Sequence, residues 1–302
     1  MITLQQLRYF RELAQTEQLT RTAEKLFITQ TTLSNTIKNL ETQLGVKLFD
    51  RVGRTLRLNE VGRKYLTYVS EALDALENAQ IMIDDHSGNN LSVSVAMTNS
   101  NIWSDLVQGF CSKHKNYSFH QEGCDYALLR GMLINQKTDF VIAGVDDFPL
   151  SGLEYRVIRE EQLYLGVSKE HRFADRTSIT LAEAKDERFI NLPESHAFRW
   201  FCDSLFQKAG IAYKEAITCD YTLRGKLVAE NIGVVITTHS FMMQNMMGVD
   251  IVYIPITDAF AKRPLAIIWN SRHYLNRAAL DFRDYVLSYG GMPAAGWTED
   301  AS

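Results

Sequence analysis

Residues 27–45 read FITQTTLSNTIKNLETQLG and predict one helix with both of its ends marked. Thr29 can accept a hydrogen bond from a backbone N–H of the first turn, and Gly45 can adopt the left-handed conformation that ends a helix. One face of this helix is apolar, with spacings of 4, 3 and 4 between Leu33, Ile37, Leu40 and Leu44.

Two shorter helices are predicted before it. The first covers residues 4–14, where apolar side chains recur at helical spacing, and Thr3 is its expected N-cap. The second begins at Thr20 as its cap, and its inward-facing residues are Ala23, Leu26 and Phe27. Because a tight turn near Ile28 joins the second and third helices, the pattern is typical of a helix-turn-helix.

The third helix has a polar face opposite its apolar one, since each residue rotates by about 100°. Small polar side chains there can approach base edges, and a cation further along can reach phosphate or guanine. The residues concerned are Gln30, Thr31, Thr32, Ser34, Asn35 and Lys38. Every surface helix has a solvated polar face, so this face alone is weak evidence for DNA binding.

A hairpin is predicted directly after the third helix. Val46–Phe49 and Thr55–Leu58 are strand-like runs, and a glycine-containing segment joins them. Three arginines lie around this turn at spacings of three: Arg51, Arg54 and Arg57. A β-wing beside a recognition helix typically uses such arginines on phosphates or in the minor groove. The hairpin therefore strengthens the prediction of a DNA-binding module.

Charge is distributed unevenly along the 302 residues. Residues 1–64 hold 11 Lys or Arg and 6 Asp or Glu, so the formal net charge of −4 hides a basic module on an acidic body. This asymmetry favours contact between the module and a polyanion. The sequence lacks a membrane-spanning apolar run, an N-terminal signal segment and a disulfide framework. We therefore expect no membrane partner, and a cytoplasmic protein with reduced thiols.

A long helix is predicted from Glu60 to about His86, because the stretch lacks proline and has a single glycine in its first turn. Spacings of 3 and 4 alternate along an a/d heptad seam with one polar member, Gln80. An amphipathic helix lying on a core is the alternative. The position after a DNA module favours pairing of two chains through Leu66, Val69, Leu73, Leu76 and Ile83.

The rest of the chain alternates strand-like and helical segments. A strand–helix–strand–helix–strand pattern covers 91–145, and a second set covers 161–238. A strand at 265–269 and a helix at 276–289 close the pattern. Two such sets predict two α/β lobes, with ligands beyond the carboxyl ends of the parallel strands.

The N-terminal motifs resemble the winged helix-turn-helix of LysR-type transcriptional regulators. The resemblance rests on residues 27–34, 37–41, 44–51 and 58–62, which read FITQTTLS, IKNLE, LGVKLFDR and LNEVG. Two positions depart from the family pattern. Thr31 stands where proline or serine is usual, which leaves the base preference open. Asn59 stands where threonine is usual, and it can still cap the following helix.

The C-terminal half resembles the effector-binding domain of the same family, which itself resembles periplasmic solute-binding proteins. The resemblance rests on residues 139–144 and 227–235, which read DFVIAG and LVAENIGVV. The expected fold class is thus α/β, with an N-terminal winged helix-turn-helix, a long linker helix and a two-lobed α/β effector-binding domain. The expected domains are 1–58, 59–87 and 88–302, with lobe I at about 88–161 and 268–302 and lobe II at about 162–267.

The resemblance implies an effector between the lobes. The candidate contacts are Thr98, Asn99, Ser100, Cys124 and Asp146 in lobe I, and Ser195, His196, Phe198 and Thr237 in lobe II. Taken singly, each has a plainer interpretation as a loop or helix-capping residue. Hydroxyls and helix-start N–H groups suit a small polar or anionic metabolite, although nearby aspartates leave the sign of its charge open.

The predicted function is sequence-specific transcriptional regulation by a homodimer or homotetramer that a small-molecule effector controls. The expected partners are double-stranded promoter DNA and the effector, with RNA polymerase as a further candidate. No cofactor or metal is expected. Enzyme classes are set aside because the sequence lacks GxSxG, HExxH, P-loop and GxGxxG motifs. A competing class is a solute-binding or enzymatic α/β protein whose N-terminal helices only dimerise it.

The sequence contains residues that could form two further site types. Cys111 and His114 with His120 and Cys124 have spacings that a zinc site could use, but four strand residues span roughly 13 Å and hold the second pair apart. Peroxide-sensing LysR members carry a reactive cysteine just after a histidine in the loop at His196. Here Ala197 follows that histidine, so redox sensing is not expected.

Overall fold

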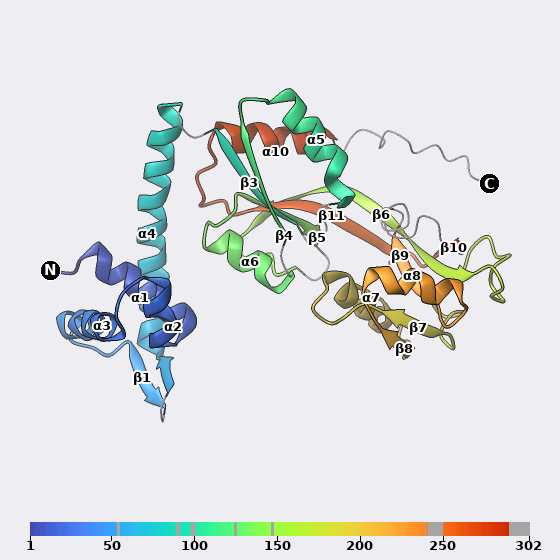
Figure 1. Cartoon of the computed structure of the whole chain (residues 1–302), viewed down its shortest axis with the longest axis horizontal. Coiled ribbons are helices and arrows are strands. Elements are labelled where there is room, and N and C mark those ends of the chain that lie inside the picture. Colours follow the sequence, from blue (N-terminus) through green and yellow to red (C-terminus); the bar gives the residue numbers. More distant parts are fainter. Residues whose placement is uncertain are drawn as a thin grey trace. The chain divides into compact units, whose positions relative to one another are not determined.

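The computed structural model describes residues 1–52, 55–88, 91–97, 101–123, 126–145, 148–238, 240 and 250–289. The chain forms two compact units, Met1–His86 and Ser87–Ser302, and each is described by itself (Figure 1). The first unit contains α1 (Leu4–Thr16), α2 (Leu19–Lys25), α3 (Gln30–Leu44), β1 (Phe49–Val52), β2 (Thr55–Leu58) and α4 (Glu60–His86).

Local capping signals set the ends of these helices. The predicted caps Thr3 and Thr29 are confirmed, since each hydroxyl accepts a hydrogen bond from a backbone N–H three residues on. Gly45 ends α3 with a φ of 71°, as predicted. Asn59 Oδ1 accepts from the N–H of Gly62 at 2.8 Å, so asparagine does cap α4.

Three local predictions for this unit are wrong. The second helix begins after Gln18 rather than at Thr20, and the first strand covers Phe49–Val52 rather than Val46–Phe49. Phe27 does not face inward, because its side chain is 96% exposed. The N–H of Ile28 bonds to the carbonyl of Ala23, a helix-ending motif that puts Phe27 in the left-handed conformation at a φ of 54°.

The core of the first unit combines all of its helices with the wing. Leu33, Ile37 and Leu40 of α3 meet Leu13 of α1, as the apolar spacing predicts. The ring of Phe10 lies 5.7 Å from that of Phe49 and 5.4 Å from that of Tyr65. The wing and α4 therefore pack on the same apolar centre as the helix-turn-helix.

The second unit is built on a mixed sheet. Its strands lie in the order β10-β6-β11-β5-β3-β4, with β9 also paired to β6. Parallel pairing joins β3 (Ser92–Met97) to β4 (Ser118–Gly123) and β5 (Phe140–Gly144), whereas β6 (Glu154–Ser168), β9 (Val235–Thr238), β10 (Ile251–Pro255) and β11 (Lys262–Trp269) pair antiparallel. The strand β10 was not predicted. The sequence pattern indicates parallel strands joined by helices, whereas β10 pairs antiparallel with β6.

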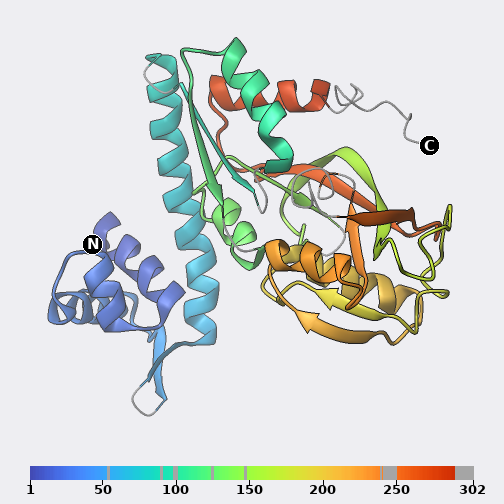
Figure 2. The same ribbon diagram turned by 45° about the vertical axis from the view of Figure 1, so that its right-hand side comes forward.

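Two helical layers enclose the first lobe. Figures 1 and 2 show α5 (Ser104–Lys113) and α10 (Arg277–Tyr289) on one face of the sheet and α6 (Tyr126–Ile134) on the other. The alternation of strand residues explains both layers. Val93, Val95 and Met97 pack toward Phe110 and Phe282, whereas Ala96 faces Leu129 and Leu133. A short 3-10 turn, Asn101–Trp103, precedes α5.

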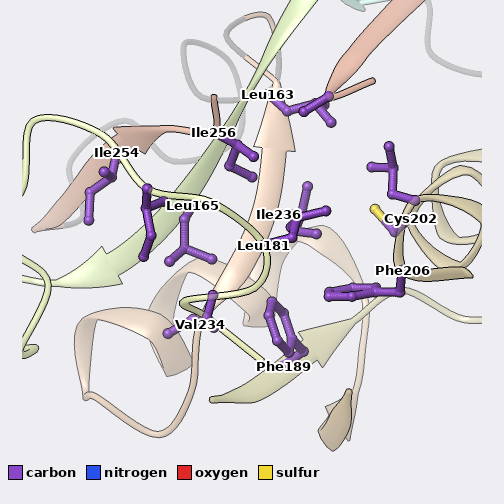
Figure 3. Close-up of a cluster of buried hydrophobic side chains, with 14 of the residues drawn as sticks. Leu163, Leu165, Leu181, Phe189, Cys202, Phe206, Val234, Ile236, Ile254 and Ile256 are labelled. Carbon is purple, nitrogen blue, oxygen red and sulfur yellow. The ribbon is translucent and has the colours of Figure 1, made fainter. Parts of the chain in front are cut away.

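The second lobe has its own core. It combines β7 (Arg188–Asn191), β8 (Lys214–Thr218), α7 (Ala197–Lys208) and α8 (Tyr221–Ala229) with the far half of β6. Figure 3 shows Leu163 and Leu165 of β6 beside Ile236 of β9, with Cys202 and Phe206 of α7 on the same cluster.

Two long strands run through both lobes. Residues 163–168 of β6 pair with β9 and β10, and earlier β6 residues pair with β11. Because Leu265–Ile268 of β11 pair with β5, these residues belong to the first lobe.

Candidate functional site

The polar face of α3 is open to solvent. The side chains of Gln30, Thr31, Thr32, Asn35 and Lys38 are exposed, and Ser34 is half-buried. Thr29 and Thr32 hydroxyls lie 2.8 Å apart at the start of the helix. Among the described residues, no hydrogen bond engages the side chains of Asn35 or Lys38. These two groups are therefore available to a ligand that approaches α3.

The wing presents one open arginine and one engaged arginine. Arg51 is exposed on β1. The guanidinium of Arg57 donates to Glu17, whose other carboxylate oxygen accepts from the N–H of Leu58 at 2.8 Å. The Leu58 N–H and then Arg57 hold the pKa of Glu17 below its ordinary value. Arg54 lies outside the described residues.

A hollow of about 460 Å³ lies between α3 and the wing. Its lining brings together three of the residues predicted to bind DNA, namely Ser34, Lys38 and Arg51, over a floor that includes Leu13 and Leu19. The lining also includes Lys47, Glu41 and Asp50, so three cations and two carboxylates meet on this concave surface. The excess of positive charge suits a phosphate-bearing polymer.

One buried carboxylate fixes the wing to α3. Glu41 is 7% exposed, and its Oε1 accepts from the backbone N–H groups of Leu48 at 2.9 Å and Phe49 at 3.3 Å. Its Oε2 accepts from Lys47 Nζ at 2.7 Å. The spacing of α3 from the wing therefore depends on Glu41, a role that the sequence pattern alone did not reveal.

The predicted dimer seam on α4 is divided between two environments. Val69 and Leu73 are 3% and 1% exposed and belong to the core of their own unit, where Leu66 also packs. Leu76 and Ile83 are exposed by 48% and 54%. The prediction that all five form one intermolecular seam is corrected here, because α1 already covers the first three.

A different face of α4 carries exposed apolar side chains. Spacings of 4, 3, 4 and 3 separate Tyr68, Ala72, Ala75, Ala79 and Met82, and all five are exposed. Tyr68 is 72% exposed and Met82 is 44% exposed. These positions follow a heptad repeat, as the predicted seam does, but they lie about a third of a helical turn away from that seam around α4.

A group of polar residues, called the polar belt, lies on or next to the paired strands β6, β9 and β11 of the second unit and comprises Arg159, Glu161, Thr238, Ser240 and Arg263. Glu161 and Arg263 lie directly opposite each other where β6 and β11 pair, and they are 2% and 4% exposed. Glu161 Oε1 accepts from Arg159 Nη2 at 3.1 Å and from the Ser240 hydroxyl. Arg159 Nη2 also lies 3.1 Å from Ser240 Oγ. Thr238 adds a fully buried hydroxyl from β9.

Aromatic rings flank the arginines of this belt. The guanidinium carbon of Arg263 lies 5.0 Å from the ring centre of Phe198, and that of Arg159 lies 5.1 Å from the ring of Trp103. A cation over an aromatic face is favourable and shields both groups from water. The first ring belongs to lobe II and the second to lobe I, so the belt contacts both lobes.

The predicted effector contacts divide into described and undescribed residues. Thr98, Asn99, Ser100, Cys124 and Asp146 lie outside the described residues. Phe198 is 3% exposed, beside Arg263, and Thr237 is fully buried on β9 next to Thr238. The ring of the half-buried His196 lies 5.4 Å from the ring of Tyr221, and Ser195 is exposed. Phe198 is thus the predicted residue that directly contacts the belt.

Comparison with known proteins gives the family. Residues 4–63 match the family model described as bacterial regulatory helix-turn-helix protein, lysR family, and residues 85–290 match the LysR substrate binding domain. The chain belongs to the LysR family of transcriptional regulators. This LysR-type chain therefore combines a helix-turn-helix with an effector-binding domain, as the sequence predicted.

Full-length relatives agree with this assignment. The chain is 30% identical over 294 residues to the uncharacterised HTH-type transcriptional regulator YybE of Bacillus subtilis, covering 94% of this chain and 98% of that protein. It is 27% identical to the transcriptional dual regulator GltC of the same organism, covering 95% and 97%.

Solved structures of LysR-type regulators share the fold. A full-length OxyR variant from Pseudomonas aeruginosa matches with a TM-score of 0.69 at 24% identity, covering 95% of each chain. CbnR matches with a TM-score of 0.59 at 19% identity, covering 96% of this chain and all of that one. The predicted fold class, a winged helix-turn-helix with a long helix and a two-lobed α/β domain, is confirmed.

The thiols of this LysR-type chain bear on the redox alternative. Cys202 is 4% exposed in the core of the second lobe, and burial raises the pKa of its thiol to about 12. A protonated, enclosed thiol is a poor nucleophile. Cys111 is exposed, and burial raises the pKa of the half-buried Cys219. Burial and a raised thiol pKa thus do not favour a peroxide-sensing role for Cys202 or Cys219.

Sequence reasoning missed the residues that form the belt. Glu161 lies among the polar residues 159–162 and Arg263 follows Lys262 at the start of its strand, so the sequence pattern does not mark either residue as buried. Within the described part of the chain, no helix is long and apolar enough to cross a membrane. The same residues contain no cluster of three or more His, Cys, Asp or Glu with metal-binding geometry.

Proposed function

We propose that this LysR-type regulator reads promoter DNA with α3 and holds the DNA backbone with Lys38 and Arg51. The observation that carries the proposal is the open polar face of α3 beside the hollow that Ser34, Lys38 and Arg51 line. Asn35 supplies a bidentate amide for a base edge in the major groove. Arg57 contributes less than Arg51, because Glu17 already accepts from its guanidinium.

Gel-shift titrations of the full chain with DNA from its own promoter region test this proposal. We expect Asn35→Ala to change which sequences bind, and Lys38→Met and Arg51→Ala to weaken binding to all sequences. Lys115→Met, an exposed change in the second unit, is the matched control and should bind as the native protein does. Native-like affinity of both cation variants at every salt concentration would contradict the proposal.

We infer that two copies pair through the exposed face of α4. The heptad spacing from Tyr68 to Met82 and the three exposed alanines between them favour close packing of two helices. Sedimentation of Ala72→Glu and Ala79→Glu tests this, because a carboxylate at the seam should dissociate the dimer. Thr67→Glu adds the same charge on another face of α4 and should sediment as the native protein does. A homotetramer requires further contacts in the second unit.

The polar belt between the lobes is the proposed effector site. Its side chains come from β6, β9 and β11, so a bound molecule would contact the strands that join the two lobes. We further propose that the protein acts in the cytoplasm by binding alone, without catalysis, with RNA polymerase as a candidate partner. A promoter-reporter assay in which an effector changes expression without being consumed supports this part of the proposal.

A further inference from the structure

Arg263 is a buried cation, and one of its hydrogen-bond donors has no acceptor. Its Nε is enclosed and has no hydrogen-bond partner, and no carboxylate of the described residues lies within ion-pair distance of the guanidinium. Rings of α7 cover it instead, at 5.0 Å for Phe198 and 5.6 Å for Phe201. A buried charge without a counter-ion destabilises a protein unless another group compensates for it.

Gly144 leaves room for this guanidinium at the carboxyl end of β5. A Cβ atom at Gly144 would lie 3.0 Å from Arg263 Nε, which is tighter than ordinary contact. The carboxyl ends of parallel strands are where open α/β sheets bind ligands. Arg263 therefore lies at the position in the lobe where a ligand is expected.

Further buried polar atoms of the belt lack hydrogen-bond partners. Glu161 Oε1 accepts from Arg159 and Ser240, but Glu161 Oε2 is buried with no donor. The hydroxyl oxygen of Thr238 on β9 is also buried and unsatisfied. Glu161 faces Arg263 directly across the antiparallel ladder, where opposite side chains stand on the same face of the sheet. The unsatisfied donor and the unsatisfied acceptor thus belong to residues that are direct cross-strand neighbours.

A second buried arginine makes the surroundings electropositive. Arg224 of α8 is 3% exposed and donates to the carbonyl oxygens of Ile190 at 3.0 Å and Ile236 at 2.8 Å. Neither acceptor carries a formal charge, and no ion pair of Arg224 occurs among the described residues. The charges of Arg224 and Arg263 both act on Tyr221, whose pKa burial raises to about 12. The two cations therefore share one neighbourhood.

We propose that the effector is a carboxylate with a hydroxyl or ammonium donor beside it, that is, a hydroxy acid or an amino acid. The carboxylate accepts from Arg263, and the donor of the ligand binds Glu161 Oε2. Hydrogen bonds to charged partners in a buried site discriminate strongly against a ligand that lacks the matching group. This inference rests on the proposed effector site, and it adds the chemical class of the ligand and the two residues that recognise it.

Thermal unfolding and calorimetry of the full chain test the class with matched probes. One series is propionate, lactate, alanine and lactamide, and the other is succinate, malate and aspartate. We expect at least one compound that has both a carboxylate and a neighbouring donor to raise the Tm. The matching acid without the donor, propionate or succinate, should bind at least about tenfold more weakly. A comparison of the affinities of lactate and malate with those of alanine and aspartate distinguishes a hydroxyl donor from an ammonium donor.

Two variants connect the ligand to the residues. Arg263→Met should abolish the ligand-induced shift in Tm. The Tm of the free protein should stay unchanged or rise, because an apolar side chain of similar size replaces an uncompensated buried charge. Glu161→Gln should erase the difference between the substituted and unsubstituted acids, since an amide N–H competes with the donor of the ligand. Arg176→Met removes an exposed arginine of a surface ion pair and is the control.

The inference fails if no probe of either series shifts the Tm, or if Arg263→Met keeps the shift. It also fails if the unsubstituted acids bind as tightly as the substituted ones. None of these outcomes touches DNA binding, which the gel-shift titrations measure separately. An effector of another class is then indicated, while the proposed regulator function remains.

Discussion

Removal of the Glu41 carboxylate should loosen the wing from α3 more than any exposed substitution does. In Glu41→Ala the backbone N–H groups of Leu48 and Phe49 lose their acceptor, and both residues are buried, at 0% and 6% exposure. An orphaned buried donor costs about 1–3 kcal/mol, so two cost roughly 2–4 kcal/mol after water satisfies part of the loss. The ion pair with Lys47 adds little, because that side chain is 68% exposed.

Hydrogen exchange measured by mass spectrometry on the full chain can resolve this change within the first unit. A loss of about 3 kcal/mol accelerates exchange of the protected amides of α3 and the wing by about two orders of magnitude. Glu24→Ala removes an exposed carboxylate from α2 and should leave the same peptides unchanged. Glu41→Gln keeps an acceptor oxygen near both N–H groups, so its effect should be clearly smaller.

The reasoning would be refuted by equal exchange in Glu41→Ala and Glu24→Ala. That result would mean that the wing is held by Phe10, Phe49 and Leu58 of the apolar core alone. A loss of DNA affinity in Glu41→Ala without faster exchange would point instead to direct contact with DNA. The 7% exposure of Glu41 argues against such contact.

Three further predictions concern the same unit. The folded-state pKa of Glu17 is lowered, so its carboxylate stabilises the wing at pH values above its ordinary pKa of 4.5. This stabilisation is lost as the pH falls through the lowered pKa, and faster exchange of the Leu58 amide should report the loss. Glu17→Gln should remove the pH dependence. Arg51→Ala should reduce the salt dependence of DNA binding by about one phosphate contact, and Arg57→Ala by less, in titrations against salt. Gly62→Ala should destabilise the first unit by about 1–3 kcal/mol in denaturant titrations, because its Cβ would overlap the Leu48 carbonyl oxygen.

Local signals explain why most helices could be predicted from the sequence. The caps Thr3 and Thr29, and the left-handed Gly45, act within one turn of the chain, so a single sequence contains all of their information. Asn59 does the same for α4. The inward prediction for Phe27 failed because the motif that ends α2 fixes its backbone, and apolar character alone does not reveal that.

The division of α4 could not be predicted for a different physical reason. A heptad pattern shows that a helix has apolar positions, but it does not show what covers them. Val69 and Leu73 are covered by the core of their own unit, whereas Tyr68 and Met82 are exposed on another face. Apolar residues surround more than half of this helix, so either face could have been the intermolecular one. Packing within the first unit covers one of these faces and leaves the other exposed.

The belt depends on strand register, which the sequence does not contain. Glu161 and Arg263 are about a hundred residues apart, and only the pairing of β6 with β11 brings them face to face. Thr238 joins them through the pairing of β9 with β6 opposite Leu163. The predicted loop residues Ser195 and His196 were chosen by their place after a strand, a rule that finds loops but cannot find side chains within a strand.

The two candidate sites differ in how much desolvation of their polar side chains destabilises the protein without a ligand. The side chains of α3 that we propose to face DNA are mostly exposed, so water satisfies them when DNA is absent and their replacement should leave stability nearly unchanged. The belt holds Arg263 Nε, Glu161 Oε2 and the Thr238 hydroxyl away from water without partners, so the empty state carries their desolvation penalty. A ligand that satisfies these atoms should therefore stabilise the second unit strongly, whereas DNA should stabilise the first unit only through new contacts. Hydrogen exchange in the presence of each ligand separates these two effects, because a protected β6–β11 ladder with unchanged α3 identifies the belt as the effector site.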